Sequence, residues 1–170
     1  AYMIRLLDER FRLNIGIAEM EKHAAKIGAD CAFFIEAEPA YAEGIGDELM
    51  PVDGPKGNLN GYYLAIVKPD IAVSTKEAYA AITPTATSKS CREIVRQPIE
   101  TWKEELVNDF EAPIFKLHPE LAEIKEKLYQ QGAKYAAMSG SGSALFGIFE
   151  TEPNGLKEMF QDCFCEVLKL

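Results

Sequence analysis

The stretch MSGSGSALFGIF, residues 138–149, sets a run of serines and glycines between two apolar segments. The apolar runs at 134–138 and 144–149 have the length of buried strands, so the sequence predicts a strand, a loop and a strand. Glycines let backbone amides approach an anion with no Cβ in the way, and the serine hydroxyls add donors. Small residues between strands also serve any tight connection. The loop is therefore a candidate phosphate and substrate loop, formed by Ser139, Gly140, Ser141 and Gly142.

Further strands are predicted upstream of this loop. Residues 62–67 form the clearest buried strand, ended by a proline, and residues 41–52 alternate well enough for one or two more. The short apolar run at 31–35 is also of strand type. The segments 53–61 and 83–90 are rich in turn-forming residues and predict loops.

Helical patterns alternate with these strands. Residues 1–14 and 17–27 carry apolar side chains at intervals of three and four, and the glycine that follows the second pattern predicts a left-handed stop. Ser74 and Glu77 form an S-x-x-E capping pair at the start of a helix over 75–82. Proline starts, a glycine stop and apolar content predict further helices at 98–107, 119–131 and 154–168.

These elements predict one mixed α+β fold with an antiparallel sheet and helices packed on one side. A chain of 170 residues, 48% hydrophobic, can bury a core for one ordinary domain. The pattern contains no internal repeat and no low-complexity stretch, so it gives no reason to expect a second full domain.

The composition excludes several classes of function. A formal charge of −9 with no cluster of Lys or Arg argues against nucleic-acid binding, although a nucleotide remains possible because loop amides and magnesium can hold phosphates locally. The four cysteines and two histidines lack metal-ligand spacing, which predicts no metal site and reduced thiols, with Cys163 and Cys165 on a packed C-terminal helix. No apolar run approaches the length of a membrane span, and we expect a cytoplasmic protein.

Asp30 permits two interpretations. Most carboxylates between a helix stop and the next element cap the turn. However, an aspartate held on a rigid frame also suits a base that meets a substrate hydroxyl at hydrogen-bond distance. The spacing alone leaves both roles open.

Tyr79 is equally ambiguous, because an aromatic side chain at helical spacing is usually part of the core. Its alternative role is a face on which a nucleobase stacks. Lys76, Glu43 and Asp47 are expected to be solvated surface residues.

Five motifs occur in an order that resembles the GHMP small-molecule kinases, and among them the 4-diphosphocytidyl-2-C-methyl-D-erythritol kinases. The glycine loop is common to the superfamily, whereas the ordered set covers nearly the whole chain and is more specific. The motifs are GADCAFF at 28–34, AYAEGIGDELMPV at 40–52, KPDIAVSTKEAY at 68–79, NDFE at 108–111 and MSGSGSALFGIF at 138–149.

This resemblance implies ATP- and Mg²⁺-dependent phosphorylation of the hydroxyl of a cytidine-diphosphate-linked methylerythritol, in the non-mevalonate route to isoprenoids. The family's catalytic aspartate falls on Asp30, which would accept or orient the hydroxyl proton. The family's third glycine-rich motif falls on Ser139–Gly142, near the site of phosphate transfer. The aromatic residue that stacks on cytosine in some members falls on Tyr79.

Two departures from the family pattern shape the expectations. The main ATP-binding loop and its lysine would lie before Ala1, so residues 1–29 are expected to be a helical remnant of the N-terminal ATP-binding domain and 30–170 the C-terminal domain. We therefore expect a fragment with little or no kinase activity, whose first helix exposes an apolar face that favours self-association. The second departure is Ala32, where members usually carry proline.

Two other classes of function stay open. Another GHMP kinase, acting on homoserine, mevalonate or a sugar, would share the glycine loop. A non-catalytic α+β binding or regulatory module would share the architecture alone.

Overall fold

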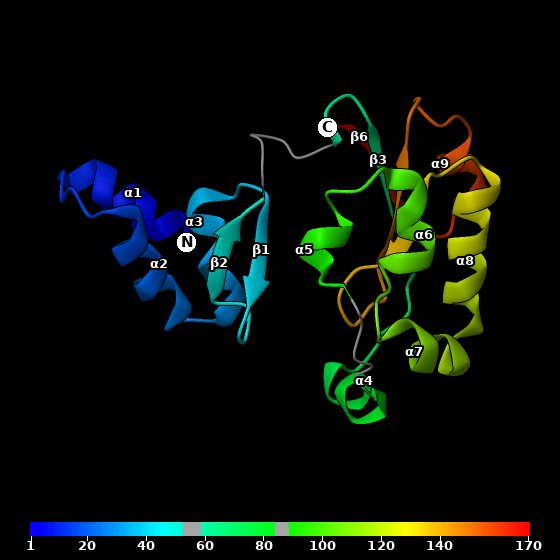
Figure 1. Ribbon diagram of the computed structural model, residues 1–170, viewed down its shortest axis with the longest axis horizontal. Coiled ribbons are helices and arrows are strands. Elements are labelled where there is room, and N and C mark those ends of the chain that lie inside the picture. Colours follow the sequence, from blue (N-terminus) through cyan, green and yellow to red (C-terminus); the bar gives the residue numbers. More distant parts are fainter. Residues whose placement is uncertain (53–58, 84–88) are drawn as a thin grey trace. The chain divides into compact units, whose positions relative to one another are not determined.

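The structure is a computed structural model of the chain, and it describes residues 1–52, 59–83 and 89–170. The chain folds into two compact units, 1–58 and 59–170 (Figure 1). The loops predicted at 53–61 and 83–90 fall mostly outside the described residues. The domain boundary predicted between residues 29 and 30 stays a prediction.

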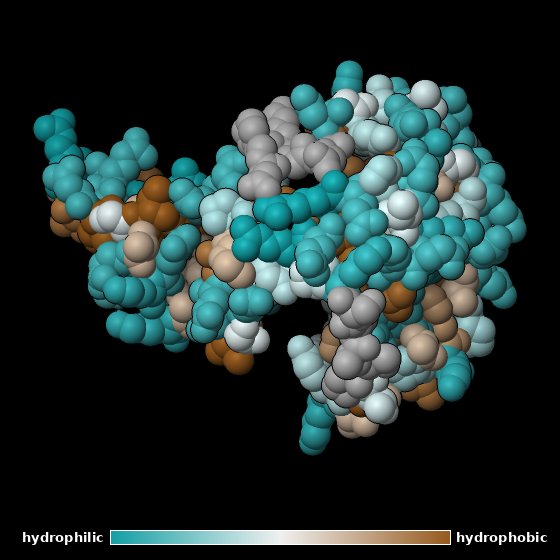
Figure 2. Space-filling view, viewed as in Figure 1, coloured by the Kyte–Doolittle hydropathy of each residue, from teal (hydrophilic) through white to brown (hydrophobic). Residues whose placement is uncertain are grey.

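The first unit begins with two helices, as predicted. These are α1 (Tyr2–Phe11) and α2 (Ile17–Ala25), and the Asp8 side chain of α1 accepts a hydrogen bond at 2.8 Å from the amide of Ile15, which lies in the link between them. No residue of α1 is buried. The expected apolar face of this helix is therefore exposed (Figure 2), and its members are Met3, Leu6, Leu7 and Phe11.

The strand predicted at 31–35 is wrong, because this segment is helical. It forms the 3₁₀ turn η1 (Ala29–Cys31) and the short helix α3 (Phe33–Glu36). Ala32 and Ile35, three residues apart, are the buried residues of the run, and Ile35 packs with Met20 and Ala24 of α2. The run is too short for a helical period to be recognised in the sequence, and packing against α2 decides its conformation.

The left-handed stop predicted at Gly28 is also wrong. Its φ of −177° is extended backbone, and the chain passes directly into η1. The unit ends in a two-stranded antiparallel hairpin of β1 (Ala40–Glu43) and β2 (Glu48–Pro51), which confirms the strands predicted within 41–52.

The second unit is built on a four-stranded antiparallel sheet with the order β4-β5-β3-β6. The strands predicted around the serine-glycine loop and at 62–67 are confirmed. The four strands are β3 (Tyr63–Lys68), β4 (Tyr135–Met138), β5 (Leu145–Phe149) and β6 (Phe164–Lys169).

The helix predicted over 154–168 is wrong in its second half. Only one turn, α9 (Leu156–Met159), is helical, and β6 follows it to pair with β3 from Lys68↔Phe164 to Tyr63↔Lys169. Cys165 therefore lies in an edge strand, and the packed helix expected to carry Cys163 and Cys165 does not form.

One face of the sheet carries the larger helices. Buried residues of α4 (Thr75–Ala81), α7 (Glu111–Leu117), α8 (Pro119–Gln130) and α9 share one core cluster with β3, β4 and β5. The helices predicted at 75–82 and 119–131 are confirmed, and Gly132, with φ 96°, ends α8. The helix α7 was not predicted.

The other face packs against shorter helical segments. These are α5 (Cys91–Ile94), η3 (Ile99–Thr101) and α6 (Trp102–Glu105), whose Ile94, Ile99 and Trp102 contact the opposite side chains of the strands. The predicted α+β class with an antiparallel sheet is confirmed, and the structure adds this second layer. In the ranges that the structure describes, no helix combines the length and apolarity needed to cross a membrane.

Candidate functional site

The serine-glycine loop connects β4 to β5, and two backbone hydrogen bonds close it. The Ser139 amide donates to the Ala144 carbonyl at 2.8 Å, and the Gly142 amide donates to the Ser139 carbonyl at 3.0 Å. The amides of Gly140 and Ser141 have no acceptor among the described residues. Two adjacent donors thus remain available to an anion.

The two glycines of the loop have different surroundings. Both have positive φ, 55° at Gly140 and 91° at Gly142. A Cβ on Gly142 would lie 2.7 Å from the Met138 sulfur, whereas one on Gly140 would meet no described atom within 4 Å. Gly142 is required for packing, while Gly140 leaves open space beside the available amides.

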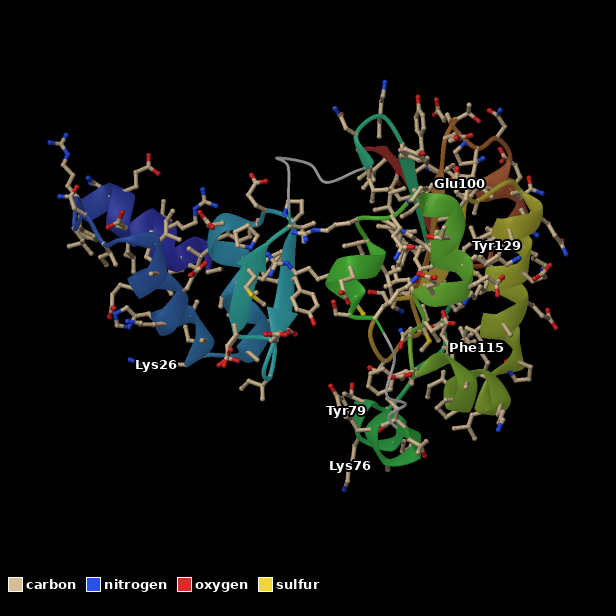
Figure 3. All side chains as sticks on the ribbon, viewed as in Figure 1. Lys26, Lys76, Tyr79, Glu100, Phe115 and Tyr129 are labelled. Carbon is tan, nitrogen blue, oxygen red and sulfur yellow. The ribbon has the colours of Figure 1, made fainter. Side chains whose placement is uncertain are left out.

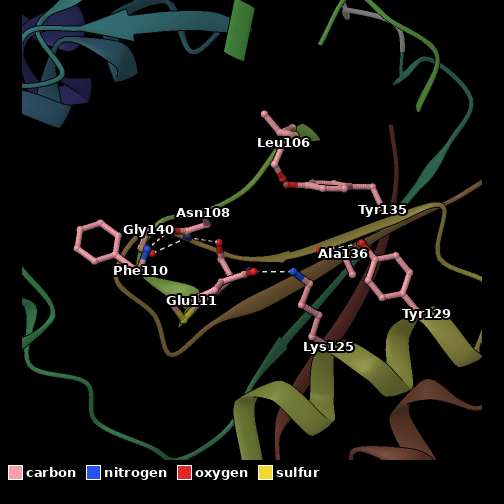
Figure 4. Close-up of polar contacts among 10 residues, drawn as sticks. Leu106, Asn108, Phe110, Glu111, Lys125, Tyr129, Tyr135, Ala136 and Gly140 are labelled. Atoms are coloured by element: carbon pink, nitrogen blue, oxygen red, sulfur yellow. Dashed lines mark hydrogen bonds and ion pairs between the residues drawn. The ribbon is translucent and has the colours of Figure 1, made fainter. Parts of the chain in front are cut away.

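The side chain of Asn108 binds the backbone of the loop (Figure 4). Its Nδ2 donates to the carbonyls of Met138 and Gly140, each at 2.8 Å, and its Oδ1 accepts from the Phe110 amide at 2.9 Å. The motif NDFE contains Asn108, but its spacing alone did not indicate a contact with a loop 30 residues away in sequence.

Glu111 supports the same strand end. Its Oε1 accepts from the Met138 amide at 2.7 Å and its Oε2 pairs with Lys125 of α8 at 2.5 Å, although the residue is only 7% exposed. A buried carboxylate is stabilised by such partners. Glu111 was also missed as a site-supporting residue, although the NDFE motif contains it.

Two tyrosines fix the sheet beside this network. The Tyr135 hydroxyl donates to the Leu106 carbonyl at 2.8 Å, and the Tyr129 hydroxyl donates to the Ala136 carbonyl at 3.2 Å. Burial raises the pKa of both side chains above the ordinary value. Both therefore remain protonated donors at neutral pH, which suits a structural role.

The start of α4 lies against the other side of the loop. The Ser143 hydroxyl donates to the Ile71 carbonyl at 2.6 Å, and the hydroxyls of Thr75 and Ser141 are 3.5 Å apart. Half of the predicted capping box of α4 is confirmed, since the Ser74 hydroxyl accepts from the Glu77 amide. The reciprocal bond from the Ser74 amide to the Glu77 side chain is absent among the described residues.

Tyr79 projects from α4 into solvent (Figure 3) and is 65% exposed, so its interpretation as a core residue is wrong. Its ring packs edge-to-face on Phe110, with centroids 4.9 Å apart. Because Phe110 follows the segment that holds the loop, α4 and α7 bring Tyr79 and Ser139–Gly142 to one region. Lys76 is exposed on the same helix, as expected.

Asp30 lies in the first unit, within η1, and is exposed. Its carboxylate has no hydrogen-bond or ion-pair partner in the part of the chain that the structure describes, so it does not cap the turn. Gly46 of the hairpin approaches it, since a Cβ there would lie 3.3 Å from Asp30 Oδ1. The meeting of Asp30 with the serine-glycine loop across one cleft stays a prediction.

Glu43 and Asp47 are exposed on the hairpin, which confirms them as surface acids. Asp47 accepts a hydrogen bond from the Ile45 amide within the turn, at 3.3 Å.

Comparison with known proteins identifies the second unit. Residues 91–164 match the family model for the C-terminal domain of GHMP kinases. This stretch contains β4, β5 and the serine-glycine loop between them. This part of the chain is therefore similar to the C-terminal domain of GHMP kinases.

Curated relatives narrow the resemblance to one kind of kinase. The 4-diphosphocytidyl-2-C-methyl-D-erythritol kinase of Parabacteroides distasonis is 50% identical over 166 residues, which are 96% of this chain and 60% of the relative. That of Bacteroides fragilis is 47% identical over 165 residues, 97% of this chain and 59% of the relative. The resemblance inferred from the five motifs is confirmed, and the chain spans about 60% of the length of these relatives.

Solved structures agree on the fold. A crystal structure of 4-(cytidine 5'-diphospho)-2C-methyl-D-erythritol kinase matches with a TM-score of 0.73 at 23% identity, covering 97% of this chain and 61% of that one. A homoserine kinase from Cytophaga hutchinsonii matches with a TM-score of 0.62 at 13% identity, covering 95% of this chain and 60% of that one. At these identities the likeness supports the shared fold alone.

Proposed function

We propose that the full-length gene product phosphorylates the hydroxyl of 4-diphosphocytidyl-2-C-methyl-D-erythritol with ATP, in the non-mevalonate route to isoprenoids. The observation that carries this proposal is identity of 47% and 50% to kinases of that name over nearly the whole chain. The loop with two available amides beside open space supports it chemically. The expectation that the 170-residue chain alone has little activity stays a prediction.

In this proposal Asp30 accepts or orients the proton of the attacking hydroxyl. The hydroxyl oxygen bonds to the γ-phosphorus of ATP, the bond to the β,γ-bridging oxygen breaks, and ADP leaves. Positioning and charge stabilisation supply most of the rate in such transfers. An exposed carboxylate with no partner among the described residues suits this role, since it remains free to meet a substrate.

The loop Ser139–Gly142 is proposed to hold phosphate oxygens of the nucleotide or of the substrate. Its Gly140 and Ser141 amides supply uncharged donors that suit a phosphate even in an acidic protein. Tyr79 is proposed to stack on cytosine, because its ring is exposed and braced by Phe110.

Magnesium bound together with the nucleotide would neutralise charge that develops on the phosphates during transfer. Within the described ranges, no group of three or more His, Cys, Asp or Glu side chains could hold a metal. In enzymes that act on nucleotides, magnesium is usually held by the phosphates and one or two carboxylates. Because the substrates are intracellular metabolites, we place the reaction in the cytoplasm.

The test measures ADP release by the full-length gene product with ATP and one of two alcohols, the cytidine-linked substrate or homoserine. We expect kcat/KM for the cytidine-linked substrate to exceed that for homoserine by at least about a thousandfold, because polar groups built for cytosine reject an analogue without it. Comparable values for both alcohols would transfer the assignment to another GHMP kinase. If calorimetry detects binding of neither ATP nor the cytidine-linked substrate, a non-catalytic module is favoured.

A further inference from the structure

The side-chain amide of Asn108 uses each of its hydrogen-bonding groups on the backbone around the loop. Nδ2 gives hydrogens to the carbonyls of Met138 and Gly140 at 2.8 Å each, and Oδ1 accepts from the Phe110 amide at 2.9 Å. Two acceptors on one side and one donor on the other fix which end of the amide is nitrogen.

The bond to Gly140 determines where the next amide points. In a trans peptide the carbonyl and the following N–H point in opposite directions. Because the Gly140 carbonyl faces Asn108, the Ser141 N–H faces away from it and has no acceptor among the residues described. The Met138 carbonyl is held in the same way, and the Ser139 N–H is directed to Ala144 at 2.8 Å.

This peptide needs an external restraint. Gly140 has φ 55°, and no described atom lies within 4 Å of its Cβ position. A glycine without side-chain contacts can adopt several backbone conformations, and the hydrogen bond from the Gly142 amide to the Ser139 carbonyl spans the Gly140–Ser141 peptide without binding either of its groups. The Asn108 hydrogen bond supplies that restraint.

We propose that Asn108 is a positioning residue, which orients the Gly140–Ser141 peptide so that the Ser141 amide faces a bound phosphate. The proposal rests on the proposed function in taking ATP as the ligand of the loop. Asn108 itself touches no phosphate in this account. It acts through the loop backbone, and its loss weakens phosphate binding while the sheet stays in place.

The sheet has an independent anchor at the same strand end. Glu111 accepts from the Met138 amide at 2.7 Å and pairs with Lys125. A substitution of Asn108 therefore leaves β4 attached to α7. This separation makes a loss of binding without a loss of fold possible.

The experiment compares the full-length gene product with its Asn108→Asp variant by calorimetric titration with magnesium and ATP. Aspartate keeps the acceptor for Phe110 but, when ionised, cannot donate to either carbonyl. We expect its Kd for ATP to rise at least about tenfold at about pH 8. Toward about pH 4, close to the ordinary pKa of an aspartate, part of the new carboxyl is protonated and can donate one hydrogen, so the difference in Kd from the parent narrows.

Tyr129→Phe is the matched control. It removes the side-chain hydrogen bond to the carbonyl of Ala136, which lies in β4 but away from the serine-glycine loop. Its Kd is expected within about twofold of the parent at both pH values. Asn108→Ser, whose shorter side chain cannot reach both carbonyls, decides by the same criterion if the aspartate variant fails to fold.

The proposal is overturned if the Kd of the Asn108→Asp variant for ATP lies within about twofold of the parent's at about pH 8. It is also overturned if the difference in Kd does not change with pH. If the parent binds ATP but does not phosphorylate the cytidine-linked alcohol, the proposed function is contradicted and the role of Asn108 is not. A parent that binds no ATP overturns both.

Discussion

Tyr79 is the residue proposed to stack on cytosine. A ring that is 65% exposed contributes little to the core, yet contact with Phe110 limits its motion. Rigid exposed aromatics are suited to stacking because little side-chain entropy is lost on binding.

Tyr79→Ala should therefore raise KM for the cytidine-linked substrate about tenfold, because stacking contributes about 1–3 kcal/mol per base. The kcat should change little, since stacking stabilises the ground state and transition state equally. Steady-state kinetics of the full-length gene product measures both. Phe164→Ala is the control, because that aromatic is 60% exposed but lies on β6. Equal KM changes in the two variants would argue against stacking.

Helices and strands were predictable where one pattern was strong. The strands on both sides of the serine-glycine loop are buried apolar runs, and the helix over 119–131 has a proline start and a glycine stop. The predictions at 31–35 and 164–169 failed for the same reason, because both runs are too short for their periodicity to distinguish a helix from a strand. In the first, packing on α2 selects a helix, and in the second, pairing with β3 selects a strand.

The loop itself was predictable as a candidate site, but its supports were not. Asn108 and Glu111 reach it only through the packing of α7 against the sheet, and sequence spacing carries no information on such contacts. The exposure of Tyr79 depends likewise on where α4 docks.

The capping box at the start of helix α5 makes a pH-dependent contribution to stability that can be tested. Its Ser90 and Glu93 form a complete capping box, which the S-x-x-E pattern at 90–93 would have indicated. Hydrogen bonds from Ser90 hold the pKa of the Glu93 carboxyl below its usual value of 4.5. The folded state thus favours the carboxylate, and this contribution to stability is present above the usual pKa and lost as pH falls through the lowered one.

Glu93→Gln should therefore destabilise the protein at neutral pH, and the difference from the parent should shrink as pH falls below 4.5. Urea unfolding of both proteins across that range measures the difference. A free-energy difference that stays constant down to the most acidic point would show that the carboxylate form is not what the cap stabilises.

At the scale of the whole molecule, the two units differ in what they bury. Residues 59–170 enclose two core clusters on the faces of a four-stranded sheet. The first unit buries only four hydrophobic residues among those described, namely Met20, Ala24, Ala32 and Ile35, and exposes the apolar face of α1. Its stability therefore depends on what covers that face.

We predict that residues 59–170 alone fold and unfold in one cooperative thermal transition, whereas residues 1–58 alone do not, because a two-stranded hairpin with a small core is marginal. Circular dichroism of the two separate polypeptides measures this. A cooperative transition in 1–58, or its absence in 59–170, would contradict the assignment of the cores.

We propose that Asp30 and the serine-glycine loop act on one substrate, and the kcat of an Asp30→Asn variant of the full-length gene product tests this proposal. Asparagine keeps the shape but cannot take a proton, so kcat with ATP and the cytidine-linked alcohol should fall at least about a hundredfold. Binding of ATP should persist, because the loop is unchanged. A kcat within about tenfold of the parent would contradict the claim.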